Sequence, residues 1–338
     1  MPLSDERRAS LVAARTATVA RDQLGLTVDR DRFQPFAGSG AAAAVDGRGV
    51  VDLGNAPGRG LGAALVWATR VGVDQLDLIV DPEVAERDAG VLARQASWFD
   101  PAPRIWRLSG VALEPVEAVP HVDPLVPPPS TAEHALLLRQ AGLEVVIEQG
   151  EVIGERRGLE VARVVIDPDG SPRLEIGIGR FDREAFALLH GDVPAPEALA
   201  RVIARIDELR RPGAEPHPMN RLVRERWLRH QIITTPGLLD AASLEPVEGP
   251  TARHGLRDPA IAAAVGQRSD GRTLVVAASV GMSVDAVSDA ADTRARHVPD
   301  ADLVVVVPTG DLHPVTTELC SRLVRPAEAV ELTPEWAG

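Results

Sequence analysis

The hydrophobic pattern of the chain alternates between amphipathic segments and long apolar runs. Apolar positions recur at helical spacing over residues 5–23 and 61–71. The runs at 76–81 and 302–308 are almost continuously apolar, as in strands buried on both faces of a sheet. Strands that alternate with helices predict an α/β fold, because consecutive parallel strands need a crossover connection.

A stretch with six prolines between residues 114 and 130 interrupts this pattern. Proline fixes φ and removes a backbone donor, so the stretch can form neither a helix nor a central strand. We therefore predict a linker there. The predicted divisions are an N-terminal α/β unit (1–113), the linker (114–130), a β-rich middle section (131–215) and a C-terminal α/β unit (216–338).

The middle section is predicted to open with a helix over 131–142 and to continue with strands. Residues 167–170 read Asp-Pro-Asp-Gly, in which proline presets φ and glycine accepts a positive φ, so they predict a tight turn. If Asp167 pairs with Ser171, Arg163 lies opposite Glu175 across the hairpin, and the two are expected to form an ion pair.

The two ends of the chain resemble each other in element order: a helix, short strands, a helix, an apolar strand, a helix and a short strand. From Asp46 to Leu108 and from Asp270 to Leu332 the spans are both 62 residues (108 − 46 and 332 − 270), and each begins with Asp-Gly-Arg. We interpret this as an internal duplication. The predicted fold class is α/β, with two mixed α-β-β-β-α-β units flanking a β-rich α+β middle section.

The composition excludes several classes of enzyme. All 36 basic residues are arginine, and the chain contains no tyrosine. Without lysine there is no Walker A nucleotide site and no Schiff-base or pyridoxal phosphate chemistry. Without tyrosine there is no tyrosine-based acid/base dehydrogenation. The net charge of −13 repels a phosphate backbone, so nucleic-acid binding would need a local basic patch.

The chain is expected to be cytoplasmic and to have no membrane partner. No apolar run approaches the ~20 residues that cross a bilayer, and the first eight residues lack the apolar core of a secretory signal. Cys320 is the single cysteine, which excludes an intramolecular disulfide and a cysteine-based zinc site. Its apolar neighbours indicate a core residue rather than a nucleophile, and no metal site is predicted.

The element order over residues 20–108 and 219–332 resembles the core of the PD-(D/E)XK nuclease superfamily. That resemblance implies carboxylates that hold Mg²⁺ and an acid-x-Lys triplet whose lysine fixes the attacking water. The triplet positions read Asp52-Leu53-Gly54 and Ala277-Ala278-Ser279. Neither contains lysine, so the resemblance implies a degenerate nuclease-like protein that binds and does not cleave.

A second resemblance concerns residues 57–81, which are similar to the pyrophosphate loop of the GNAT acetyltransferase family. In that family, Arg/Gln-x-x-Gly-x-Gly/Ala opens a helix whose N–H groups bind acetyl-CoA. The residues that fit the pattern, in two registers, are Arg59, Gly60, Gly62 and Ala64. The resemblance implies an acyl-CoA-dependent N-acyltransferase that uses the loop at 54–64. Glycines that permit close packing after a tight turn are the structural alternative.

The predicted helix over residues 219–232 is basic in an acidic chain. Arginine binds phosphate bidentately, and tryptophan stacks on bases. The candidate nucleic-acid- or phosphate-binding residues are Arg221, Arg224, Arg226, Trp227 and Arg229. In the alternative interpretation the helix is amphipathic, its apolar face is buried and its arginines pair with neighbouring acids.

A third candidate set lies in residues 179–192, where Asp182, His190 and Asp192 are weak candidates for acid/base catalysis. Roles at the two helix ends account for Asp182 and His190. The first hypothesis is a non-catalytic, nuclease-like protein without a cofactor that binds nucleic acid or another phosphate-bearing partner. The alternatives are the acyltransferase, with acetyl-CoA as cofactor, and a structural or assembly protein with a protein partner.

Overall fold

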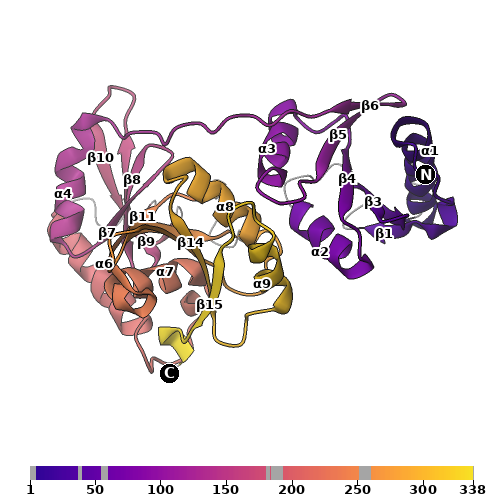
Figure 1. Ribbon diagram of the computed structural model, residues 1–338. Coiled ribbons are helices and arrows are strands. Elements are labelled where there is room, and N and C mark those ends of the chain that lie inside the picture. Colours follow the sequence, from indigo (N-terminus) through magenta and orange to yellow (C-terminus); the bar gives the residue numbers. More distant parts are fainter. Residues whose placement is uncertain are drawn as a thin grey trace. The chain divides into compact units, whose positions relative to one another are not determined.

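The computed structural model describes residues 5–36, 40–54, 60–179, 183, 193–250 and 260–337. These described residues form three sheets (Figure 1): a six-stranded sheet in the order β1-β2-β3-β4-β5-β6, a four-stranded sheet β10-β9-β8-β7, and a five-stranded sheet β11-β12-β13-β14-β15. Helices alternate with the strands of the first and third sheets. The α/β class predicted from the sequence is confirmed.

The chain forms two compact units. Unit 1 comprises residues 1–121, 284–292 and 313–327. Unit 2 comprises residues 122–283, 293–312 and 328–338. The second unit therefore combines the predicted middle section with most of the predicted C-terminal section. No helix among the described residues is both long and apolar enough to span a membrane.

The sheet of unit 1 begins as an antiparallel meander and continues with parallel strands. Its strands are β1 (Gln34–Phe36), β2 (Gly40–Val45), β3 (Arg48–Asp52), β4 (Gln75–Val80), β5 (Arg104–Ser109) and β6 (Ala112–Pro115), with helices α1 (Asp5–Leu24), α2 (Leu61–Val71) and α3 (Glu86–Ala96). Strands β3, β4 and β5 pair in parallel. Helix α1 covers one face, where Val19 packs with Val50 and Ile79. Val51 points to the opposite face and is fully buried there, because side chains alternate along a strand.

The third sheet has the same sequence of pairings as the first five strands of the sheet of unit 1. Its strands are β11 (Ala241–Val247), β12 (Ala262–Arg268), β13 (Thr273–Ala278), β14 (Asp302–Pro308) and β15 (Glu328–Leu332), with helices α7 (Arg224–Thr234), α8 (Ala286–His297) and α9 (Pro314–Ser321) in the same section. Strands β11, β12 and β13 are antiparallel, and β13, β14 and β15 are parallel. Helix α7 packs Leu228 and Ile232 on this sheet. The two ends therefore share strand order and sense, as the sequence pattern predicts.

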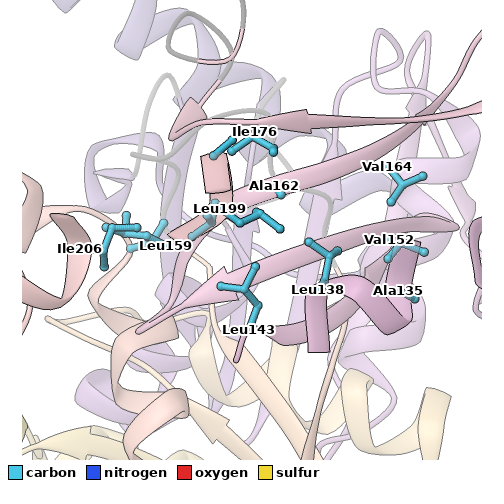
Figure 2. Close-up of a cluster of buried hydrophobic side chains, with 13 residues drawn as sticks. Ala135, Leu138, Leu143, Val152, Leu159, Ala162, Val164, Ile176, Leu199 and Ile206 are labelled. Carbon is cyan, nitrogen blue, oxygen red and sulfur yellow. The ribbon is translucent and has the colours of Figure 1, made fainter. Parts of the chain in front are cut away.

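The middle section is an antiparallel sheet with its own core (Figure 2). Its elements are α4 (Ala132–Gln140), β7 (Glu144–Glu148), β8 (Glu151–Arg156), β9 (Leu159–Ile166), β10 (Pro172–Ile176) and α6 (Ala195–Leu209). The fully buried side chains of Leu138 from α4 and Leu199 from α6 lie in the core on one face of this sheet. The predicted hairpin register is confirmed, because Glu175 lies opposite Arg163. The ion partners of Arg163, however, are Glu151 and Glu160.

The basic helix is shorter than the sequence suggested. Residues Pro218–Arg221 form a separate 3₁₀ turn, η4, and α7 begins only at Arg224. Val223 between them has a φ of 39°, a left-handed conformation that interrupts the helix. Pro218 starts the 3₁₀ turn, since its missing N–H costs nothing at a first helical position. The predicted start at residue 219 is therefore wrong.

The sequence pattern missed the two edge strands β1 and β6. Both are short, three and four residues, and offer little periodicity to recognise. Strand β6 ends at Pro115, inside the predicted linker. Residues 116–128 form neither helix nor strand, as expected from their prolines.

We expect Gly158→Ala to destabilise the protein, because a Cβ at this position lies 2.4 Å from backbone atoms of Arg226 and Trp227 in α7. Overpacking of this kind costs about 1–3 kcal/mol. Gly170→Ala is the matched control, since Gly170 has a similarly positive φ but nothing within 4 Å of its Cβ position. Urea unfolding of both variants measures the difference, and equal destabilisation would contradict the packing.

Candidate functional site

Helix α7 is shared by two sheets of unit 2. Its apolar side, with Leu228 and Ile232, covers the third sheet. Its arginines instead meet a row of glutamates on the middle sheet: Arg226 and Arg229 both bind Glu155 of β8, and Arg226 also binds Glu148 of β7. The helix therefore has two buried sides of opposite chemistry.

The ion pairs on the basic side of α7 are closely spaced and shielded from water. Arg226 donates to Glu155 at 2.5 Å and to Glu148 at 2.6 Å, and Arg229 donates to the second oxygen of Glu155 at 2.5 Å. The Glu155 side chain is 0% exposed, and that of Arg229 is 2% exposed. His230 continues the row by binding Glu144. Burial alone lowers the pKa of Arg226, but the charges of Glu155 and Glu148 raise it overall.

These contacts correct the predicted phosphate-binding surface. Arg226, Trp227 and Arg229 lie in the interior, so α7 does not offer them to a nucleic acid. The signal was ambiguous because the same basic pattern fits a solvated face and a face that meets carboxylates. The alternative interpretation, in which the helix is amphipathic and its arginines pair with neighbouring acids, describes these three residues.

Two of the five predicted residues reach the surface. Arg221, at the end of η4, is exposed, and Arg224 is half-buried with its guanidinium 5.7 Å from the ring centre of Trp336. Trp336 lies 5.2 Å from Trp227, ring centre to ring centre. The guanidinium of Arg210 lies over the indole of Trp227, 4.8 Å from its ring centre. The result is a row in which two neighbouring, tilted indoles lie between two guanidiniums.

Arg210 holds η4 in place. It is fully buried and donates to the carbonyl oxygens of Arg157 at 2.8 Å, of Met219 at 2.7 Å and of Leu222. These partners are neutral, and burial lowers the pKa of Arg210 to about 9. This residue and Trp336 were missed by the sequence analysis, since neither belongs to a recognisable motif.

The glycines of the predicted pyrophosphate loop have packing partners inside unit 1. The N–H of Gly62 donates to the carboxylate of Asp285 at 3.0 Å, and a Cβ on Gly62 would lie 2.1 Å from the carbonyl oxygen of Val284. A Cβ on Gly60 would meet the side chain of Leu53 at 2.7 Å, and Ala64 is fully buried. Acetyl-CoA would therefore have to displace Asp285 from the first turn of α2. Arg59 lies outside the described residues.

A polar cluster at the carboxyl ends of β3 and β4 was missed by the sequence analysis. Arg15 of α1 donates to Asp52 at 2.8 Å and to Asp81 at 3.1 Å. Asp52 also accepts from the hydroxyl of Thr16 and the N–H of Gly54, both at 2.9 Å. Burial alone lowers the pKa of Arg15, but the two carboxylates raise it overall. A signal existed, since each aspartate directly ends an apolar strand.

The third candidate set, Asp182, His190 and Asp192, lies outside the described residues. In the described part of the chain, no three histidine, cysteine, aspartate or glutamate side chains converge as a metal site would require. The comparisons with known proteins add no assignment: no protein-family model, curated protein or solved structure matches this chain.

Replacing Arg229 with methionine should destabilise the protein by about 3–5 kcal/mol, because Glu155 then keeps a buried charge with one partner fewer. The triple variant Glu155→Leu, Arg226→Leu, Arg229→Met should be more stable than the single variant, since it leaves only the partly exposed Glu148 without its partner and no fully buried charge. Arg205→Met is the control, as its pair with Glu208 is exposed. Chemical denaturation followed by circular dichroism ranks the three. A single variant as stable as the control would refute the buried network.

Cys320 should be unreactive in the folded protein. It is 1% exposed, and burial raises the pKa of its thiol to about 12. We expect the Ellman reagent at pH 8 to label it only after denaturant is added. Rapid labelling without denaturant would instead indicate an accessible thiol, and would reopen the possibility of a reactive cysteine.

Proposed function

We propose that this chain is a non-catalytic, nuclease-like protein that binds nucleic acid and does not cleave it. The observation that supports the non-catalytic part is the cluster at Asp52. Its carboxylate is 1% exposed and already accepts hydrogen bonds from Arg15, Thr16 and Gly54. A guanidinium bridges Asp52 and Asp81, the two carboxylates that end adjacent parallel strands, where nuclease-like chemistry would need a cation.

The proposed binding surface is the junction of α6, η4 and α7 in unit 2. Arg221 is exposed there, Arg224 is half-buried, and Arg211 is exposed directly after the buried Arg210. Because Arg210 fixes the carbonyls of Met219 and Leu222, it presents these arginines from an ordered turn. Arginines that are already ordered lose less conformational entropy on binding. A few of them are therefore enough to bind a phosphate backbone.

Arg221→Glu combined with Arg224→Glu should weaken binding to a 30-nucleotide single strand and to the matching duplex. The control, Arg201→Glu with Arg205→Glu, changes the charge equally on exposed positions of α6. Fluorescence anisotropy between 50 and 200 mM salt should give a log–log slope smaller by about 0.7–0.9 for each phosphate that the variant no longer neutralises.

Three results bear on the proposal. Weaker binding in the η4–α7 variant alone supports the surface. Equal weakening in both variants means that only net charge matters, and this contradicts the surface. Wild-type protein that fails to bind either strand, or that cleaves one in Mg²⁺, contradicts the function itself.

A further inference from the structure

Two short segments of unit 1 form an isolated antiparallel β-bridge although they come from the two similar ends of the chain. Phe99, just after α3, bridges Leu323, just after α9. The N–H of Asp100 donates to the carbonyl of Arg322 at 2.8 Å, and the N–H of Val324 donates to the carbonyl of Trp98, also at 2.8 Å. Residues 98–100 and 322–324 therefore each donate one backbone hydrogen bond to the other segment.

The paired residues occupy equivalent positions in the two ends. Leu323 follows Phe99 by 224 positions, and Asp270 of the second Asp-Gly-Arg turn follows Asp46 of the first by the same number. Each bridge residue closely follows the last crossover helix of its sheet. A contact in which a residue meets its own counterpart is isologous, the kind that a two-fold axis generates between two identical subunits.

Side chains beside the bridge repeat this relation. The indole N–H of Trp98 donates to Asp292 at 3.0 Å, and the guanidinium of Arg322 donates to Thr69 at 3.0 Å. Arg322 follows Trp98 by 224 positions, and Asp292 precedes by one the residue that corresponds to Thr69. A single pairing could arise by chance, but a bridge and its flanking contacts with one offset indicate a two-fold arrangement.

A bidentate ion pair joins α3 to α8. Arg94 donates to both carboxylate oxygens of Asp292, at 2.9 and 3.0 Å, and the two side chains are 12% and 0% exposed. Gln95 donates to Asp289 one turn away. Bidentate, shielded pairs of this kind discriminate strongly between opposite and like charges.

We infer that the surface formed by α2, α3 and residues 98–100 is a self-recognition surface, inherited from a homodimer, that can bind residues 284–292 and 313–327 of a second copy of this chain. The same contacts serve within one chain or between two, so only effective concentration decides between them. The chain that leaves this surface is held on α3 as far as Pro120, since the N–H of Val119 donates to Gly90 at 3.1 Å and Arg94 donates to the carbonyls of Val119 and Pro120. The covalent connection to the sequence that follows therefore begins at residues 121–128, which form neither helix nor strand.

A charge exchange between Arg94 and Asp292 tests the inference. Arg94→Asp alone and Asp292→Arg alone each place like charges at the buried pair, so each should be a monomer with a lower melting temperature. Refolded together, the two variants can pair opposite charges only between chains. Light scattering after size exclusion should then find a 1:1 heterodimer, at least ~10-fold more abundant than either variant's homodimer.

The single-chain variant that carries both substitutions is the control. It restores opposite charges within one chain and should be monomeric and more stable than either single variant. A mixture that behaves as the sum of its components, while this control folds, would overturn the inference. If the control does not fold, wild-type chains with donor or acceptor dyes at their N-termini are refolded together over a range of concentrations. Energy transfer in a dimer fraction that grows with concentration supports the surface, and its absence throughout overturns it.

Discussion

The buried contact of Glu155 with Arg226 and Arg229 determines how unit 2 is built. A carboxylate with no exposed surface between two nearly buried guanidiniums is stable only when every partner is present, since a lone charge there would cost several kcal/mol. The contact fixes both the position and the rotation of α7. Because the opposite side of that helix covers β11–β14, it also fixes the third sheet relative to the middle sheet within unit 2.

The same principle explains why the apparent functional motifs of this chain are occupied from within. Arginine is the only side chain in the sequence that stays cationic at every ordinary pH, and its planar fork suits carboxylates held in fixed positions. Arg15 bridges two strand ends, Arg94 joins α3 to α8, and Arg226 joins α7 to the middle sheet. In a chain with 49 acidic residues, a local basic pattern is therefore weak evidence of an external phosphate.

Much of the fold could be predicted from sequence, because long apolar runs and helical spacing record burial directly. Strand β14, helix α2 and the turn at residues 167–170 are examples in which local pattern and tertiary structure agree. The start of α7 was mispredicted because the left-handed Val223 has no local signal.

The surroundings of the candidate site residues were harder to predict, for a physical reason. Whether Arg226 faces water or Glu155 depends on a strand some 70 positions earlier in the chain, and helical periodicity contains no information about that distance. The role of Gly62 could not be predicted from sequence for the same reason. Its role depends on Val284, more than 200 residues later, so a phosphate loop and a packing contact look alike in sequence. Arg221, which the sequence pattern placed on a helix, is instead exposed at the end of the 3₁₀ turn η4.

The sharing of α7 between two sheets has a practical consequence for fragments of this chain. A truncation placed between the middle sheet and α7 would leave Glu155 on one fragment and Arg226 and Arg229 on the other. Each of these buried charges would then lack its ion-pair partner. We expect neither fragment to be soluble or to fold as it does in the intact chain. Residues 116–128 contain no strand or helix, but a boundary there would likewise separate Arg94 from the fully buried Asp292, so expression should keep the chain intact.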